Sequence, residues 1–311
     1  MTNSLSPSKE RGDTGGEVTI KFTKLQSVGN DFVLVEVSDR QRDWSQIARA
    51  ICQRRFGVGG DGLVLLLPSY IADFGMRILN SDGSEAEACG NGLRCLVKYA
   101  IDRGLANTEA KEITVETIAG VRKSRLIKED KVTKIQVGMG KPEFEAKNIP
   151  VAIEPGKGDL VDIKLISNYP LAVEGRELGL NFVSMGNPHA IHFWNRPLPD
   201  FPLSRLGPAV EKHRLFPNRV NFEVAHVISR REIEVRVWER GVGETLGCGS
   251  GACTVAVCAQ LLGYTGSRVD IKLPGGILEV EWDMVGEVLL SGPAETVFSG
   301  EWGESCFSRE A

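Results

Sequence analysis

The sequence lacks any apolar run that approaches the roughly 18 residues needed to span a bilayer. Its N-terminus also lacks the hydrophobic stretch of a secretory signal. Basic runs and aromatic-rich basic patches are missing as well, and the net charge of -4 comes from mixed signs. We therefore expect a cytoplasmic protein with neither a membrane nor a nucleic acid among its partners.

Cysteine is scarce, because only 7 of the 311 residues are of this type. The odd number and wide spacing differ from the regular framework of small disulfide-stapled secreted domains, so we expect reduced thiols. Cys248, Cys253 and Cys258 recur too widely for one helical face and lack the paired spacing of zinc ligands. No metal site is therefore predicted.

What the chain does have is length and an ordinary globular composition. Its 311 residues are enough for two domains with sizeable cores, and 25% of them are charged and 42% apolar. Residues 1–17 are rich in Ser, Lys, Gly and Asp and contain few large apolar side chains. We expect a flexible extension there, because so little apolar surface cannot offset the entropy of ordering.

Two short stretches are versions of each other, namely Cys89-Gly90-Asn91-Gly92 and Cys248-Gly249-Ser250-Gly251, which lie 159 positions apart. The same offset relates further residues upstream, which indicates a duplicated unit. The upstream pairs are Arg77 and Arg236, Glu85 and Glu244, Met76 and Val235, and Ile78 and Val237.

Each of these turns is followed by a run that predicts a buried helix. After the first turn, apolar residues recur at helical spacing and stop at Gly104, a plausible C-terminal cap. Residues 252–262 are apolar on nearly every side, as in a wholly buried helix, and end at Gly263. The sequence therefore predicts two buried helices, each with a cysteine at its N-terminal end.

The remaining pattern predicts many strands and few helices. One more helix is expected at residues 43–55, with Cys52 packed in the core, and residues 196–217 read as a loop around a short helix. So many strands disagree with a doubly wound parallel sheet. We expect an α+β fold of two pseudo-symmetric domains, each a curled, mostly antiparallel sheet or barrel around a central helix. Strands are expected near residues 18–22, 32–37, 63–67, 74–79, 113–117, 121–127, 132–138, 160–166, 181–185, 190–193, 221–228, 233–238, 269–273, 277–282 and 287–291.

A cysteine at a helix N-terminus faces unpaired backbone N–H groups and the positive end of the helix dipole. These groups favour the thiolate and can lower the pKa of the thiol well below roughly 8.5. They also form an anion site, and the neighbouring glycines let a ligand such as a carboxylate approach the backbone closely. Cys89 and Cys248 are therefore the candidate reactive thiols.

If the two halves face each other, Cys89 and Cys248 flank one pocket from opposite sides. One thiolate can then remove a proton from a carbon while the opposite thiol delivers another, which inverts a stereocentre without a cofactor. Two alternatives to this acid/base role stay open at this point. In the first, the cysteines are packing residues after turns; in the second, they form a redox disulfide across the cavity.

Six motifs, each weak alone, form a specific set at their spacings. They are Gly29-Asn30-Asp31-Phe32, Asn80-Ser81-Asp82-Gly83-Ser84-Glu85 leading to Cys89-Gly90-Asn91-Gly92, Gly186-Asn187-Pro188-His189, Arg219-Val220-Asn221, Glu239-Arg240-Gly241, and Gly243-Glu244-Thr245 leading to Cys248-Gly249-Ser250-Gly251. With them the chain resembles the diaminopimelate epimerase family from about Phe22 to near the C-terminus.

The resemblance implies interconversion of LL- and meso-2,6-diaminoheptanedioate, in lysine and peptidoglycan precursor synthesis, without pyridoxal phosphate or metal. It assigns Cys89 and Cys248 as the acid/base pair and implies that His189 and Glu239 tune the thiols. Main-chain groups are implied to hold the reacting carboxylate, and they belong to Gly90, Asn91, Gly249 and Ser250. The residues implied to bind the amino and distal carboxylate groups are Asn30, Asn80, Asn187, Asn221, Glu239 and Arg240.

The resemblance also implies how the chain is divided. It places one domain at residues 18–140 and the other at 141–294, with a last strand at 295–305 that returns to the first domain. The active site is expected in the cleft between them. The expected partner is the small substrate, diaminopimelate, and a homodimer stays an open alternative.

One departure from the family concerns Gly62, where some members carry a substrate-contacting Gln, so no substrate role is assigned to it. The related alternative is proline racemase or hydroxyproline epimerase, which shares the fold and the cysteine pair. The Glu239-Arg240 dyad and the several Asn residues argue instead for a longer, doubly zwitterionic substrate.

Overall fold

The structure is a computed structural model, and it describes residues 19–37, 41–86, 89–110, 112–129, 132–154, 156–161 and 165–303. The flexible extension expected at residues 1–17 lies outside this range. Four α-helices fall within it: α1 (Trp44–Ile51), α2 (Gly90–Asp102), α3 (Leu203–Glu211) and α4 (Gly249–Leu261), together with the short 3-10 helix η2 (Leu198–Asp200).

Strands make up most of the regular structure. The first half of the chain contains β1 (Thr19–Ser27), β2 (Asn30–Glu36), β3 (Gly62–Leu67), β4 (Phe74–Asn80), β5 (Ile113–Thr117), β6 (Gly120–Glu129) and β7 (Val132–Gly138). The second half contains β8 (Asp159–Val161), β9 (Leu165–Ser167), β10 (Tyr169–Val173), β11 (Arg176–Ser184), β12 (Pro188–Phe193), β13 (Asn221–Ser229), β14 (Glu232–Glu239), β15 (Gly243–Thr245), β16 (Arg268–Leu273), β17 (Gly276–Glu281), β18 (Leu289–Gly292) and β19 (Glu295–Gly303).

The two halves repeat one pairing scheme. In the first half β2 pairs with β3 in parallel, β3 with β4 antiparallel, β4 with β5 in parallel, and β5, β6 and β7 follow as an antiparallel meander. In the second half β12, β13, β14, β16, β17 and β18 follow the same sequence of directions. Helix α2 lies between β4 and β5, and α4 lies between β14 and β16. The duplication seen in the sequence is thus a duplication of topology.

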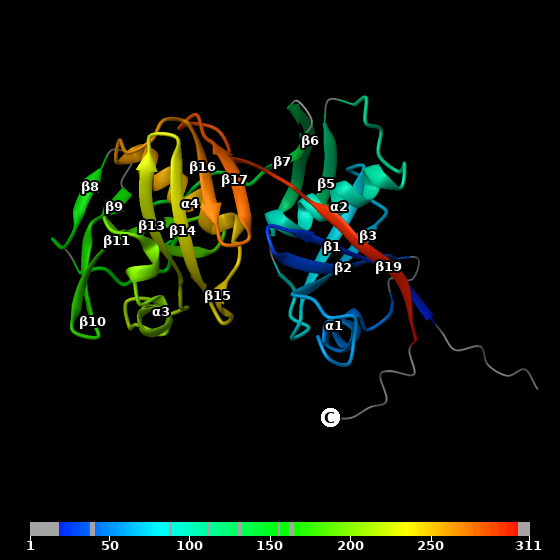
Figure 1. Cartoon of the computed structure of the whole chain (residues 1–311), viewed down its shortest axis with the longest axis horizontal. Coiled ribbons are helices and arrows are strands. Elements are labelled where there is room, and N and C mark those ends of the chain that lie inside the picture. Colours follow the sequence, from blue (N-terminus) through cyan, green and yellow to red (C-terminus); the bar gives the residue numbers. More distant parts are fainter. Residues whose placement is uncertain are drawn as a thin grey trace, which may run out of the picture.

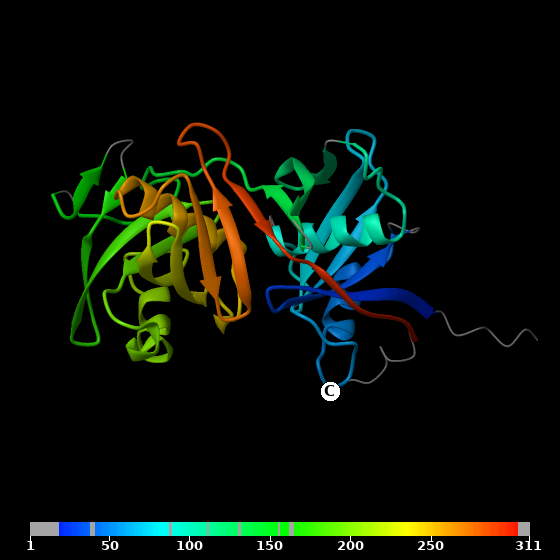
Figure 2. The same cartoon turned by 45° about the horizontal axis from the view of Figure 1, so that its top comes forward.

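Two strand pairings join the halves. β7 pairs antiparallel with β18, so that 17 strands form one hydrogen-bonded sheet. β19, the strand that the resemblance implies, leaves the second half and pairs antiparallel with β1 from Gln26 opposite Glu295 to Thr19 opposite Gly303. Figures 1 and 2 show the two helix-and-sheet bodies side by side, with β19 in red running from one across the other.

The α+β fold is confirmed, but the sheet is open. The strand path runs from β19 at one edge, through the β7–β18 junction, to β10 at the other edge. No pairing among the described strands closes either half into a barrel. The domain boundaries stay a prediction, and we propose residues 18–140 and 141–294 because β7 and β18 are the last strands of the two repeats.

Helices α2 and α4 are buried inside the halves, as their apolar patterns predict. Residues from both helices belong to one hydrophobic core that also contains Leu290 of β18. Helix α1 packs with β1 and Trp302 in a second hydrophobic cluster, which belongs to the first half. Helix α3 packs in a third cluster, which belongs to the second half. Cys52 lies in the α1 core, as expected for a packing residue.

Local differences from the sequence prediction are confined to short elements. α1 ends at Ile51, because Cys52 already caps the helix. The single strand expected at residues 160–166 is wrong, since β8 and β9 form a small antiparallel pair there. β10, which the sequence analysis missed, pairs antiparallel with β11 at the sheet edge. Strands of three residues, such as β8 and β9, carry too few residues to display a period.

Trp302 anchors the returning strand, because its side chain is only 7% exposed in the core under β1 and α1. Trp302→Ala should lower the free energy of unfolding by roughly 3 kcal/mol, the cost of removing a buried aromatic ring and leaving a cavity. Urea unfolding at neutral pH measures this. Val297→Ala is the control, because Val297 lies on the same strand and is exposed, and its effect should stay within about 0.5 kcal/mol. Equal effects of both substitutions would contradict the anchoring role.

Candidate active site

The two cysteines of the repeat cap the two buried helices. Cys89 is the N-cap residue of α2 in an extended conformation, and its sulfur accepts the N–H of Gly92 at 3.3 Å. Cys248 caps α4 in the same way and accepts the N–H of Gly251 at 3.4 Å. Each thiol therefore occupies the position that a Ser or Asp side chain usually takes at a helix start.

The two helix N-termini lie against each other at the junction of the halves. A Cβ built on Gly249 would lie 3.6 Å from Oδ1 of Asn91, and the Asn91 amide donates to the carbonyl of Gly247 at 3.3 Å. Leu290 of β18 packs under both turns, 3.2 Å from the Cβ position of Gly90 and of Gly249. Glycine suits both positions, because a Cβ at Gly90 would lie 2.7 Å from Sδ of Met139 and one at Gly249 would crowd Leu290.

The environment of the thiols corrects one expectation. Burial raises the pKa of Cys89 and raises that of Cys248 well above its ordinary value, and the charge of Glu239 acts in the same direction on both. The N–H groups of Gly92 and Gly251 lower the pKa but do not outweigh the burial. The helix dipole by itself predicts a lowered pKa, whereas the loss of solvent that raises the pKa arises from the tertiary structure.

The upstream pairs of the repeat form matching ion pairs. Arg77 Nε donates to Oε1 of Glu85 at 2.6 Å and Nη2 donates to Oε2 at 3.0 Å. Arg236 binds Glu244 with the same two nitrogens at 2.8 and 3.0 Å. In both halves the glutamate lies four residues before the cysteine, so a strand arginine holds the segment that leads to each thiol.

Asn30 lies beside Cys89. Its Oδ1 accepts from the side-chain amide of Asn91 at 3.1 Å and lies 3.9 Å from the sulfur of Cys89. Its Nδ2 donates to Asp61 at 2.7 Å, which fixes the orientation of the amide. Asn30 begins β2 instead of lying inside the turn, and its carbonyl faces the thiol.

A fully buried arginine supports the first turn. Arg94, 0% exposed on α2, donates to Oδ1 of Asn91 and to the hydroxyl of Ser27 at 2.8 and 3.2 Å. Ser27 in turn donates to the carbonyl of Pro293 at 2.7 Å, just before β19. Burial lowers the pKa of Arg94 to about 10, and the charge of this residue lowers the pKa of Cys89.

A chain of polar contacts surrounds Cys248. The hydroxyl of Ser250 lies 3.5 Å from the sulfur and accepts from Nδ2 of Asn187 at 3.3 Å. Oδ1 of Asn187 lies 3.0 Å from Nε2 of His189, whose Nδ1 lies 2.7 Å from Oε1 of Glu223. His189 and Glu223 are both 0% exposed, so this chain runs from the protein interior to the thiol.

The remaining expected site residues divide into two places. Glu239 is half-buried beside Thr245, whose hydroxyl donates to it, and the loss of solvent raises its pKa. Asn221 accepts the N–H of Arg240 at 2.9 Å, which ties these two residues together. Asn80 instead binds Ser84 within its own turn at 2.9 Å and makes no described hydrogen bond to the cysteine turns.

Gly62 has little room for a side chain. It begins β3, and a Cβ there would lie 2.7 Å from the carbonyl oxygen of Leu79. The backbone contact therefore accounts for glycine at this position.

Sequence reasoning missed Arg94, Asp61 and Glu223. Arg94 carried a visible signal, because a charged residue stood in an otherwise apolar stretch of a buried helix. Glu223 follows Asn221 by two positions on one strand, so both point to the same face of the sheet. Asp61 gave no comparable signal, because a carboxylate in a glycine-rich turn is usually solvated.

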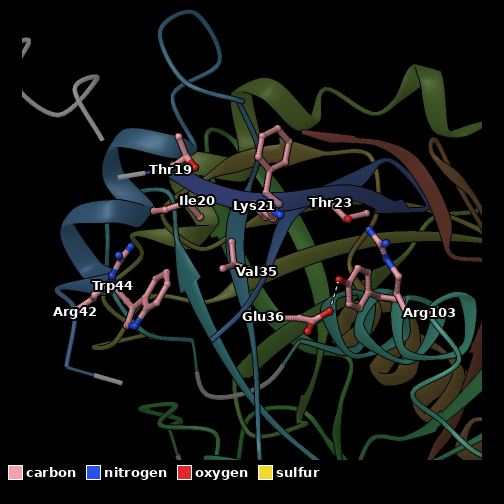
Figure 3. Close-up of a pocket in the computed structure, with 11 residues that line it drawn as sticks. Thr19, Ile20, Lys21, Thr23, Val35, Glu36, Arg42, Trp44 and Arg103 are labelled. Atoms are coloured by element: carbon pink, nitrogen blue, oxygen red, sulfur yellow. Dashed lines mark hydrogen bonds between the residues drawn. The ribbon is translucent and has the colours of Figure 1, made fainter. Parts of the chain in front are cut away.

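Other features lie apart from the cysteines. A pocket of about 400 Å³ lies among β1, the start of α1 and the end of α2, where Tyr99 donates to Glu36 at 2.6 Å (Figure 3). It shares no lining residue with the expected site.

Among the described residues, no three His, Cys, Asp or Glu side chains are grouped so as to hold a metal ion. No helix in the described part of the chain has the length and apolarity to cross a membrane. The six cysteines that the structure describes are all free thiols.

Solved structures share this fold. A probable proline racemase from Agrobacterium radiobacter K84 has a TM-score of 0.67 at 14% identity, over 93% of this chain and 94% of that one. A hydroxyproline epimerase from Agrobacterium vitis has a TM-score of 0.65 at 14% identity, over 92% and 93%. The chain thus has the two-domain fold found in racemases and epimerases.

The family follows from closer sequence similarity. A family model described as diaminopimelate epimerase matches residues 22–145 and 181–297, one stretch in each half. The diaminopimelate epimerase of Desulfovibrio desulfuricans is 47% identical over 288 residues, which are 92% of this chain and 99% of that protein. That of Pelotomaculum thermopropionicum is 46% identical over 285 residues, 90% and 98%. The chain belongs to the diaminopimelate epimerase family and is an enzyme of the isomerase class, which confirms the resemblance.

The charges next to Asn30 predict an acid-dependent loss of stability. Burial alone would raise the pKa of Asp31, but hydrogen bonds and charges of Arg54 and Lys24 outweigh it and lower the pKa to about 2. The lowered pKa of Asp31 contributes about 2 kcal/mol to the free energy of unfolding. This contribution is fully present above pH 4 and is lost as the pH falls towards 2.

The measurement is urea unfolding of the wild type and Asp31→Asn between pH 7 and pH 2. The wild type should be more stable at pH 7, and the difference should shrink through pH 4 to 2. A difference that stays constant over this range would contradict the assignment.

Proposed function

We propose that the chain interconverts LL- and meso-2,6-diaminoheptanedioate, in lysine and peptidoglycan precursor synthesis, with Cys89 and Cys248 as the acid/base pair. The observation that carries this proposal is the contact between two cysteine-capped helix N-termini at the junction of the halves, with Glu239 acting on both thiols. The reaction needs an acid and a base on opposite faces of one carbon, and two facing helix ends supply them.

In the proposed mechanism one cysteine, as thiolate, removes the proton from the α-carbon. The opposite cysteine, as thiol, delivers its proton to the other face of the same carbon. The C–H electron pair stays on the carbon between the two transfers, and the reverse reaction exchanges the two roles. The raised pKa of a buried thiol makes its thiolate a stronger base, which suits a weakly acidic C–H bond.

The helix ends would hold the reacting carboxylate. Main-chain N–H groups of Gly90, Asn91, Gly249 and Ser250 lie in the first turns of α2 and α4, where helix N–H groups lack intrahelical partners. As the α-carbon becomes carbanion-like, charge spreads onto this carboxylate, and preorganised donors stabilise it. The expected cleft between the domains would admit the substrate.

The amino groups and the distal carboxylate of the substrate would bind the polar side chains of both halves. Arg240 offers a planar donor fork for a carboxylate, and Glu239 can pair with an ammonium group. Asn30, Asn80, Asn187 and Asn221 would complete the set with amide donors and acceptors. His189 and Glu239 would tune the thiols, His189 through Asn187 and Ser250, and Glu239 by its charge.

The wider setting follows the same proposal. We place the enzyme in the cytoplasm, with the small-molecule substrate as its partner and no nucleic acid or membrane. No pyridoxal phosphate or metal takes part in the proposed reaction. A homodimer stays an open prediction.

Removing either thiol should stop the reaction. Cys89→Ala and Cys248→Ala should each lower kcat at least about 10³-fold, because one of the two proton transfers loses its group. A stereochemical assay on LL-diaminopimelate measures this, with L-proline as the control substrate that should not react. Cys258→Ala is the matched protein control, because Cys258 is a buried cysteine further along α4. Full turnover with either reactive cysteine missing would reject the two-thiol mechanism.

Turnover in deuterated water should place solvent deuterium at one α-carbon of the product. The proton that the delivering thiol supplies comes from solvent, whereas the abstracted proton leaves on the other sulfur. Mass spectrometry and NMR of the recovered diaminopimelate detect this. Product without deuterium, formed only after pyridoxal phosphate is added, would reject the cofactor-free scheme.

A further inference from the structure

Glu211, the last residue of α3, has a buried carboxylate that lies outside the family motifs. Its side chain is 4% exposed and accepts three hydrogen bonds. Oε2 accepts from the indole N–H of Trp238 at 2.9 Å, and Oε1 accepts from the N–H of Gly241 at 2.9 Å. Oε1 also lies 3.5 Å from Nη1 of Arg219. Every partner is a donor.

These three donors flank the segment that is expected to bind the distal end of the substrate. Trp238 and Gly241 stand immediately before and after the Glu239-Arg240 dyad. Arg219 precedes Asn221 by two residues, and Asn221 in turn accepts the N–H of Arg240 at 2.9 Å. One carboxylate therefore fixes both ends of the dyad and the residue that lies just before β13.

One of the segments that Glu211 holds has a conformation that needs support. Arg219 has a φ of +59°, which costs energy for a residue with a side chain, and Gly241 has a φ of +77°. Helix α3 supplies a rigid base, because a Cβ on Gly207 would lie 2.5 Å from the indole of Trp238. The buried Leu206 and Val210 fix the helix in the core of the second half.

The chemistry at this place requires an acceptor with two oxygens. Burial alone would raise the pKa of Glu211, but its hydrogen-bond donors and nearby cations outweigh this and lower the pKa, so the side chain is ionised at neutral pH. An amide at this position would turn its NH₂ group towards either the indole N–H or the backbone N–H. Two donors would then face each other in a dry environment.

We propose that Glu211 is a positioning residue for the distal ammonium and carboxylate of the substrate, acting through the Glu239-Arg240 turn. It sets the affinity for a substrate with a second charged end through the backbone on either side of the dyad. It leaves the cysteines untouched, because Thr245 and not Glu211 holds the carboxylate of Glu239 whose charge acts on them. This inference rests on the proposed function.

The test is the steady-state kinetics of Glu211→Gln with diaminopimelate. KM should rise about tenfold while kcat falls less than about threefold, because the binding turn loosens and the thiols do not. The alkylation rates of Cys89 and Cys248 by iodoacetamide, followed by mass spectrometry, should stay within about twofold of the wild type. An unchanged KM overturns the proposal, as does a common fall of kcat, alkylation rate and unfolding midpoint.

A second variant separates the hydrogen-bond geometry from the loss of charge. Trp238→Phe removes the indole donor, so in the double variant Glu211→Gln/Trp238→Phe the amide oxygen can accept from Gly241 without a donor clash. Its KM should be closer to the wild-type value than that of Glu211→Gln alone. Additive increases in KM overturn the proposed geometry.

Glu279→Gln is the matched control. Glu279 is also a buried carboxylate, but it binds Arg268 and Lys134 instead of the dyad turn. The KM of Glu279→Gln should therefore equal that of the wild type. A similar rise in KM for this control overturns the specific role of Glu211. A wild-type chain that is inactive on diaminopimelate rejects the proposed function itself, whereas an active wild type with an unchanged KM in Glu211→Gln rejects only this inference.

Discussion

Two helix N-termini packed against each other in the interior are the constraint on which the rest of the structure depends. Each brings unpaired N–H groups and the positive end of a helix dipole, so together they favour negative charge between them. Glycines at positions 90 and 249 let both turns rest on Leu290. The β7–β18 pairing and the return of β19 to β1 hold the halves in this arrangement. The N–H groups at this place can hold a carboxylate, and they offset part of the burial that raises the pKa of both thiols.

The scaffold around the thiols is symmetric, and the polar environment is not. Both halves hold the segment before the cysteine with an arginine–glutamate pair and let the sulfur cap a helix. Cys89 then neighbours an asparagine fixed by Asp61, whereas Cys248 neighbours a serine linked through Asn187 to a buried histidine and Glu223. Inversion of a stereocentre in both directions needs two thiols that can exchange the roles of acid and base, whereas recognition of a long substrate needs two different sides. A duplicated fold with diverged neighbours meets both needs.

Sequence patterns located the large features because these depend on local periodicity. The two buried helices and most strands were visible as apolar repeats, and the 159-residue offset identified the paired cysteines. The short strands β8 and β9 were merged into one, since three residues carry no period, and β10 was missed. The direction of the thiol pKa was also wrong, because burial depends on neighbours that are distant in the sequence.

The sequence by itself determined the repeat, the α+β class, the family and the residue types at the site. Only the tertiary structure decided that Arg94 is buried behind Asn91, that the sheet stays open, and that Glu211 of an outer helix reaches the Glu239-Arg240 turn. The physical reason is the range of the interactions. Helix and strand periods are local. Desolvation, donor–acceptor pairing and the contact of two helix ends are not local, because they arise between segments far apart in the chain or between elements whose spacing shows no pattern.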